Sequence, residues 1–253
     1  MRKNSPLMSR TIASHIRLTL IALGLLLLAG LSTPAVAQMA GGASNPELQQ
    51  KIAALKQSAA ENKQRLHHYQ WVETQQITLK GEQKPQKVFQ CSYGPNGQVM
   101  KVPMGDQQQA PQQRGRLRER VVEKKTDEMK AYMQQVQSLL SMYVPPNPEL
   151  IQQAMQKHNV SIDKTMGSPL TNIVFKNYAK DGDQMIVGFD TAAKKIATIN
   201  VNTYMDKPGD AVTLAIQMGS LPDGTNYAQQ TVLNATAKQI QVTTTNANYA
   251  KIQ

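Results

Sequence analysis

An even succession of alternating segments, each closed by a short turn, fills the second half of the chain and constrains its fold more than any other feature. Within 195–205, the apolar Ile199 and Val201 alternate with the polar Asn200 and Asn202. Side chains of a strand point alternately to the two faces of a sheet, so one face is apolar and the other polar. Short turns at even spacing predict an antiparallel meander whose apolar face must be covered. The predicted strands are 173–178, 185–190, 195–205, 211–218, 226–233 and 239–245.

A helix and a first group of strands precede the meander. Residues 45–47, Asn-Pro-Glu, place a capping side chain, a proline and an acid where helices begin, and an apolar stripe continues to about residue 65. Alternation then takes over, and Asn96-Gly97 readily takes the positive φ that a tight hairpin turn demands. The predicted strands of this group are 67–79, 88–93 and 99–102.

Two further helices interrupt the strands. Residues 104–115 contain few apolar side chains and predict a mobile loop. The helix predicted for 116–143 has one apolar face and is ended by Pro145-Pro146, and Asn147-Pro148-Glu149 begins a second helix that reaches about residue 158. This helical insertion, at about 116–158, supplies cover for the sheet. The predicted fold class is therefore α+β, an antiparallel β-meander covered by helices.

The first 37 residues predict a cleavable signal peptide. Four basic residues and no acid precede an apolar run at 18–31, which is followed by Ala35-Val36-Ala37. The small side chains of Ala35 and Ala37 suit the signal peptidase, so we expect cleavage before Gln38. An uncleaved anchor is the alternative, but a spanning helix takes roughly 20 apolar residues and this run is shorter. We expect residues 38–253 to form a single domain in the periplasm or outside the cell.

Charge and composition exclude several classes of protein. The chain has 28 Lys and Arg against 17 Asp and Glu, and removal of the four basic leader residues leaves 24 − 17 = +7. The basic cluster at 114–125 is interleaved with acids and lacks aromatic neighbours, which predicts a solvated helix face rather than an anionic-surface patch, and no nucleic-acid partner. Scarce aromatic residues also argue against an aromatic groove for peptides or sugars. Cys91 is the single cysteine and is interpreted as a small buried hydrophobe, with an intermolecular disulfide as the alternative.

Motifs of catalysis are absent from the sequence. It contains no Gly-x-Ser-x-Gly elbow, no His-Glu-x-x-His and no phosphate-binding glycine loop. His67 and His68 fall on a predicted strand and would point to opposite faces, which does not suit one metal. Asp181 and Asp183 flank a turn glycine and are interpreted as turn residues. We expect no enzyme activity, no cofactor and no metal site; an enzyme assembled from scattered residues is the remaining alternative.

Apolar residues on the long helix and the meander form the candidate ligand site. Methionine is flexible and polarizable, so a surface rich in it can repack around acyl chains of different length, although ordinary core packing is the alternative interpretation. We expect the helix 116–143 to lie over the sheet as a lid. The predicted ligand-binding residues are Met129, Val136, Leu140, Leu214, Ile216 and Met218.

The order of these elements resembles the periplasmic lipoprotein-localisation superfamily, which includes the carrier and receptor that move lipoproteins to the outer membrane and a regulatory relative that senses envelope stress. Residues 187–196, a strand, a turn that begins with Asp190 and the next strand, are similar to a habit of that family. The resemblance implies a half-open β-barrel with helices in its mouth that binds lipid without covalent chemistry.

What the resemblance implies for partners is an acyl chain or a lipoprotein as ligand, a possible envelope protein partner, and only transient membrane contact. The chain departs from the receptor because no cysteine that could be lipidated follows the apolar run, and no arginine that could latch the lid stands out on the first strands. A divergent member of the superfamily is therefore expected. The alternative is an envelope interaction or regulatory module with a packed core and no ligand.

Overall fold

A single antiparallel sheet dominates the computed structural model, which describes residues 60–105, 116–164 and 170–252 together with residues 50, 53, 57 and 168. The predicted cleavage residues Ala35, Ala37 and Gln38 lie outside the described residues, as does most of the predicted loop 104–115. The strands are β1 (Tyr69–Leu79), β2 (Glu82–Gln83), β3 (Lys87–Tyr93), β4 (Val99–Pro103), β5 (Val160–Asp163), β6 (Leu170–Lys176), β7 (Gln184–Asp190), β8 (Lys195–Tyr204), β9 (Ala211–Ser220), β10 (Asn226–Ala235) and β11 (Ile240–Lys251).

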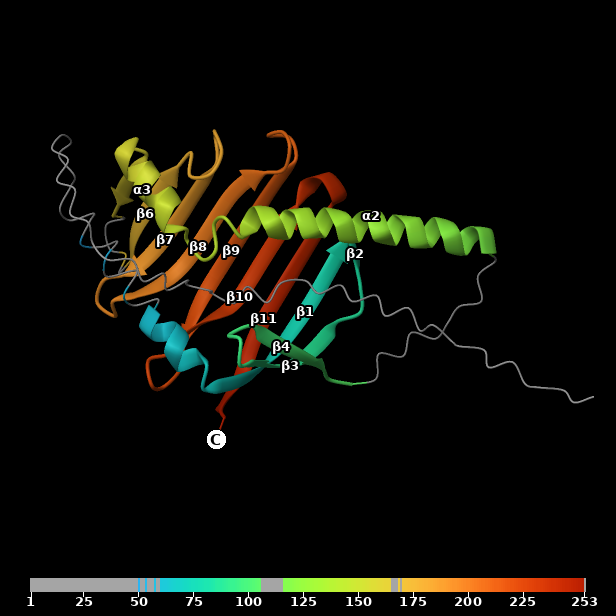
Figure 1. Ribbon diagram of the computed structural model, residues 1–253, viewed down its shortest axis with the longest axis horizontal. Coiled ribbons are helices and arrows are strands. Elements are labelled where there is room, and N and C mark those ends of the chain that lie inside the picture. The colour runs from blue at the N-terminus through green and yellow to red at the C-terminus, as the bar shows by residue number, and fades with distance from the viewer. Residues whose placement is uncertain are drawn as a thin grey trace, which may run out of the picture.

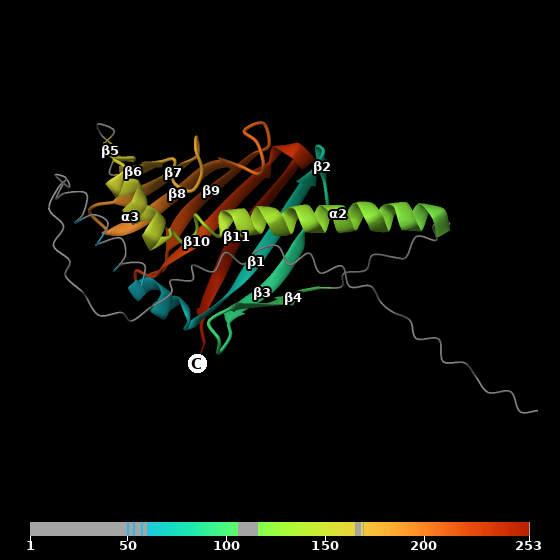
Figure 2. The ribbon, with the colours of Figure 1, turned by 45° about the horizontal axis from the view of Figure 1, so that its top comes forward.

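The sheet is open and its strand order is β4-β3-β1-β11-β10-β9-β8-β7-β6-β5, with β2 beside β1. From β5 to β11 each strand pairs with its neighbour in sequence, as the predicted meander requires. The helices α2 (Arg116–Leu140) and α3 (Pro148–Gln156) lie across one face (Figures 1 and 2). The predicted α+β class with an open antiparallel sheet under helices is confirmed.

The joint between the first strands and the meander is made by the last strand. β11 pairs with β10 on one side and, antiparallel, with β1 on the other, with Leu79 opposite Ile240 and Gln70 opposite Ala250. In Figure 1 the cyan β1 therefore lies directly beside the red β11.

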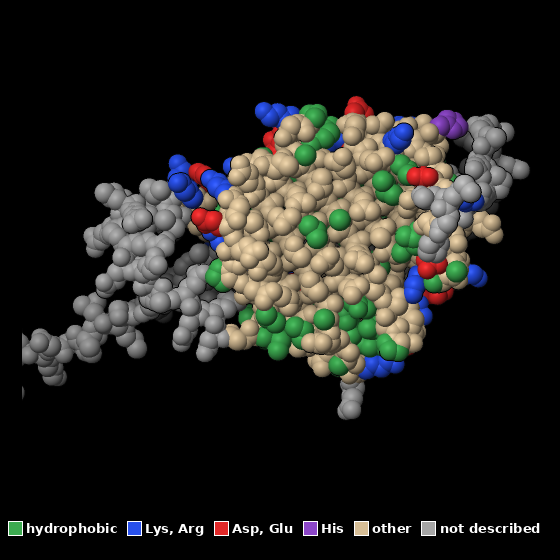
Figure 3. All heavy atoms as spheres, turned by 180° about the vertical axis from the view of Figure 1, so that it is seen from behind, with side chains coloured by type: hydrophobic (Ala, Val, Ile, Leu, Met, Phe, Trp, Pro, Cys, Tyr) green, Lys and Arg blue, Asp and Glu red, His purple; other side chains and the backbone are tan. Residues whose placement is uncertain are grey.

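The two faces of the sheet differ as the alternation predicts. On β8, Ile199 and Val201 are buried beneath the helices, while Asn200 and Asn202 are exposed. The opposite face shows mainly backbone and uncharged polar side chains over its centre (Figure 3). No helix in the part of the chain that the structure describes is both long and apolar enough to cross a membrane.

Several element boundaries differ from the predicted ones. The helix predicted for 116–143 ends at Leu140, and residues 141–146 form turns, because Pro145 lacks the N–H that would continue the helix. β5 was missed, and β11 continues to Lys251 rather than to residue 245. His67 and His68 lie in a turn before β1, so the prediction that both belong to a strand was wrong. Residues 60–66 are helical, at the end of the first predicted helix.

The start of α3 is fixed by its capping residue, as predicted. The Asn147 side chain accepts hydrogen bonds from the backbone N–H groups of Glu149, at 2.8 Å, and Leu150, at 3.4 Å, and Pro148 occupies the first helical position. An N-cap of this kind stabilises a protein by about 1 kcal/mol. We expect Asn147→Ala to lower the free energy of unfolding by about that amount in urea titrations. Asn147→Asp, which keeps the acceptor, should lose much less; equal losses would contradict a capping role.

Candidate ligand-binding site

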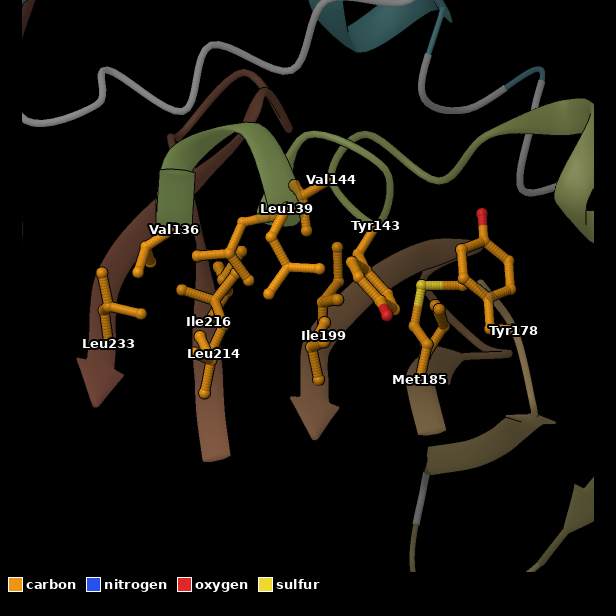
Figure 4. Close-up of a cluster of buried hydrophobic side chains, with 14 of the residues drawn as sticks. Val136, Leu139, Tyr143, Val144, Tyr178, Met185, Ile199, Leu214, Ile216 and Leu233 are labelled. Atoms are coloured by element: carbon orange, nitrogen blue, oxygen red, sulfur yellow. The ribbon is translucent and has the colours of Figure 1, made fainter. Parts of the chain in front are cut away.

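The C-terminal half of α2 packs against the apolar face of the sheet. Val136 and Leu140 are fully buried, and Figure 4 shows Val136 and Leu139 pointing toward Leu214, Ile216 and Leu233 on the strands below. Met129 and Met218 are partly buried at the margin of this cluster. The structure thus places all six predicted ligand-binding residues in or against one hydrophobic cluster between α2 and the sheet.

The described part of α2 is buried unevenly. Tyr132 donates a hydrogen bond to Asp210 at 3.1 Å, and the chain from Tyr132 to Tyr143, which lies just beyond the end of α2, contributes buried side chains to the core. Residues 124–131 are exposed or half-buried, and the N-terminal end of the helix extends beyond the edge of the sheet (Figures 1 and 2). Within the described residues, the C-terminal half of α2 is therefore more closely packed on the sheet than residues 124–131.

Asp183 anchors the segment that follows α2. The Tyr143 hydroxyl donates to its carboxylate and is also 2.7 Å from the Thr203 hydroxyl. The backbone N–H groups of residues 178, 179 and 180 donate to the same carboxylate, at 2.5, 3.0 and 2.8 Å. Asp183 is only 2% exposed, and burial, followed by the bond to Asp183, raises the pKa of Tyr143. The turn role predicted for Asp183 is confirmed. The same carboxylate also binds Tyr143, which lies just beyond the C-terminal end of α2.

The inner face of the sheet beneath α2, here called the floor, changes from aliphatic to partly polar across the strands. One lateral row of facing side chains is aliphatic from β5 to β9 and then polar on β10, β11 and β1. Its members, in strand order, are Ile162, Ile173, Val187, Ile199, Ile216, Thr231, Thr244 and Gln75. The adjacent row is apolar throughout, with Val160, Phe175, Met185, Val201, Leu214, Leu233, Val242 and Ile77. We call Thr231, Thr244 and Gln75, with Glu73 and Asn246 of the next row, the polar corner.

A cavity of about 50 Å³ lies where the aliphatic floor meets the polar corner. About 10–15 Å³ of such space accommodates one water molecule, and a cavity of roughly 150 Å³ holds benzene. It therefore has room for a small polar group and is much too small for an acyl chain while α2 is packed down. Its lining residues are Glu73, Gln75, Leu140, Leu214, Ala228, Thr231, Leu233, Val242, Thr244 and Asn246.

Two side chains of the polar corner are buried, although polar side chains usually lie at the protein surface. Glu73 is 3% exposed and forms an ion pair of 2.5 Å with Lys101 of β4. Burial raises the pKa of Glu73, and the positive charge of Lys101 opposes that rise. Gln75 is 2% exposed, and its Oε1 atom has no hydrogen-bond partner among the described residues. A buried acceptor without a donor is unfavourable, by about 1–3 kcal/mol.

An aromatic cluster adjoins the polar corner. Trp71 stacks on Tyr249 at 5.5 Å between ring centroids, Tyr227 lies 4.4 Å from Tyr249, and His67 stacks on Tyr93 at 4.5 Å. The Trp71 indole N–H donates to Asn246 at 3.1 Å, so the cluster also orients the polar corner. Its members come from residues 67 to 249, and no local motif signals that they meet.

The described residues give little support for a nucleophilic cysteine or for a metal site. Cys91 lies opposite Trp71 in the β1–β3 ladder, is fully buried as predicted, and burial raises its pKa to about 12. Such a thiol stays protonated at neutral pH and is a poor nucleophile. Within the same described ranges, no three His, Cys, Asp or Glu side chains lie close enough together to hold a metal ion.

Comparisons with known proteins give similarity at the level of solved structures. No protein-family model matches the chain, and no curated protein sequence matches it. A DUF1329 family protein from Desulfovibrio piger is 8% identical with a TM-score of 0.36, covering 80% of this chain and 92% of its own. An outer membrane lipoprotein-sorting protein domain from Vibrio parahaemolyticus is 9% identical with a TM-score of 0.35, covering 77% and 91%. A LolA superfamily protein from Nitrosomonas europaea is 5% identical with a TM-score of 0.37, covering 80% and 94%.

Two of these three structures carry the names of the lipoprotein-localisation group that the sequence resembles. Identities below 10% and TM-scores below 0.4 identify no site residue in this chain. The candidate site is therefore defined by its own contacts.

Proposed function

We propose that this protein is a non-catalytic binding protein of the periplasm or cell exterior, whose ligand is an acyl chain or the lipid part of a lipoprotein. The ligand enters between α2 and the aliphatic floor, and Met129, Val136, Leu140, Leu214, Ile216 and Met218 contact it. The carrying observation is the uneven burial of α2 over an aliphatic floor: the chain is closely packed from Tyr132 to Tyr143, whereas residues 124–131 are exposed or half-buried.

The physical basis of the proposal is an exchange of equivalent contacts. An acyl chain offers the floor the same kind of apolar surface as the side chains of α2, so the burial of apolar area lost by the helix is replaced by burial against the ligand. Because the fixed end of α2 keeps Tyr143 bound to Asp183, the helix can move without leaving the domain. Met129 and Met218, at the margin of the cluster, are flexible enough to repack around chains of different length.

A charge placed on the floor tests this site. We expect Met218→Asp to weaken binding of a fluorescent fatty acid by more than about tenfold, because a carboxylate would have to be buried against the acyl chain. Met218 is only partly buried, so the variant should still fold. Gln217→Asp, one residue away on the exposed face of β9, is the matched control and should bind as the wild type does. Saturable binding with equal affinity in both variants would place the ligand elsewhere.

A second candidate function is an envelope interaction or regulatory module that binds no lipid. The observation in its favour is the dense packing beneath α2, where Val136, Leu140 and Tyr143 are fully buried and the cavity is only about 50 Å³. Titration of the wild type with the fluorescent fatty acid separates the two functions. Absence of saturable binding would favour the packed module.

A further inference from the structure

We propose that the polar corner recognises the uncharged, hydrogen-bond-donating end of an amphiphile, so that the preferred ligand carries hydroxyl or amide N–H groups next to its acyl chain rather than a free carboxylate. This inference rests on the proposed function, because it assigns the head-group end of the same site. It goes beyond that function by predicting which class of amphiphile binds and in which direction it lies.

The first step of the inference is the direction of the floor. The aliphatic part of the mixed row runs from Ile162 on β5 to Ile216 on β9, four strand spacings or about 19 Å. It then meets Thr231, Thr244 and Gln75 without a break. An extended acyl chain laid along this row has its apolar end toward β5 and its polar end at the cavity.

The second step is the unpaired acceptor. Gln75 lines the cavity, and its Oε1 atom is buried and has no donor among the described residues. The Asn246 amide nearby is already committed, since its oxygen accepts from Trp71 and its nitrogen donates to the Ala228 carbonyl at 2.8 Å. The hydroxyls of Thr231 and Thr244 can donate or accept. Gln75 Oε1 therefore lacks a donor, which a ligand hydroxyl or amide N–H supplies.

The third step is charge. The corner already holds one negative charge, on Glu73, and that charge is neutralised by Lys101 at 2.5 Å. A ligand carboxylate in the cavity would face Glu73 and the Gln75 oxygen, both of which repel it, and would find Lys101 already paired. A neutral head group meets neither problem. Burying a charge without a partner is strongly unfavourable, whereas a neutral donor completes the hydrogen bonding of Gln75.

The test compares two amphiphiles with the same chain. Monopalmitoylglycerol and palmitate, each below its critical micelle concentration at pH 8, are titrated against the wild type preloaded with a fluorescent acyl probe. We expect monopalmitoylglycerol to displace the probe at about tenfold lower concentration, since it gains a hydrogen bond to a buried acceptor and avoids a buried charge. Gln75→Leu should weaken the glyceride by about fivefold and leave palmitate unchanged or tighter.

Matched variants separate this inference from loss of folding and from the proposed function itself. Gln70→Leu makes the same change on the exposed face of β1 and should leave the glyceride affinity unchanged. Thr244→Val, which keeps the shape of a residue of the polar corner, should reduce the preference for the glyceride. Palmitate displacing the probe as well as or better than the glyceride, with no effect of Gln75→Leu, would overturn the head-group assignment and leave acyl binding intact. Failure of the acyl probe itself to bind would instead remove the proposed function, and this inference with it.

Discussion

Replacing Asp183 with alanine is expected to lower the free energy of unfolding by about 4 kcal/mol or more. The carboxylate accepts four hydrogen bonds in a buried position, one from the Tyr143 hydroxyl and three from backbone N–H groups of residues 178–180. Hydrogen bonds to a charged group are each worth about 1.5–3 kcal/mol, and donors left buried without an acceptor add a further penalty. Denaturant unfolding followed by far-UV circular dichroism measures the loss.

The matched control is Asp181→Ala, two residues away in the same turn. The Asp181 side chain is exposed, and only its backbone carbonyl is engaged, by the Tyr204 hydroxyl at 2.8 Å. Its replacement should change the stability by no more than about 0.5 kcal/mol. Tyr143→Phe removes one of the four donors and should lie between the two. A wild-type stability in Asp183→Ala would show that the carboxylate does not hold the turn and the end of α2 together.

The second large effect is expected from a charge beneath the lid helix. Val136→Asp should destabilise the protein by at least about 4 kcal/mol, because Val136 is fully buried between α2 and the strands and faces no described donor or cation. Thermal unfolding should show a much lower midpoint. Gln135→Asp puts the same group one position away on the exposed side of α2 and should leave the midpoint within a few degrees of the wild type.

Val136→Asp also reports on the conformation of α2 in solution. The variant should expose apolar surface, because the helix can no longer pack where Figure 4 places Val136, above Leu233 and Ile216. Binding of a hydrophobic dye to folded Val136→Asp, but not to Gln135→Asp, would be the expected sign. An unchanged unfolding midpoint in Val136→Asp would mean that α2 does not rest on the sheet.

The strands of the meander and the helical insertion could be predicted because local chemistry specifies them. Strict alternation on β8 and β9, the capping set at Asn147, and turn residues such as Asp181-Gly182 each act within a few residues. The burial of Val136, Leu140, Leu214 and Ile216 follows from the same periodicity. What the periodicity determines is which side of an element faces the core.

The position of β1 and the polar corner could not be predicted in the same way. On β1 the inward set contains Trp71 and Ile77 but also Glu73 and Gln75, so alternation alone does not predict that these two polar side chains are buried. The pairing of β1 with β11 and the ion pair from Glu73 to Lys101 set their environment, and both join residues far apart in sequence. The polar corner therefore became visible only with the tertiary structure.

The pairing of β1 with β11 also sets the order in which the fold can be completed. While the chain is being synthesised or translocated, β1, β3 and β4 emerge first and can form only their own small hairpin sheet, because the strand that joins them to the meander is β11. A contact of such long sequence separation forms slowly, because the entropy of closing a large loop is lost before the new contact contributes any stabilisation. Until β11 arrives, the β1 edge of the first strand group stays unpaired. β4 remains an edge strand in the finished sheet, and Met100 and Val102 on it are exposed. The nascent chain therefore exposes an unpaired strand edge to which a chaperone could bind. This exposure ends only when residues 240–251 have emerged and can pair with β1.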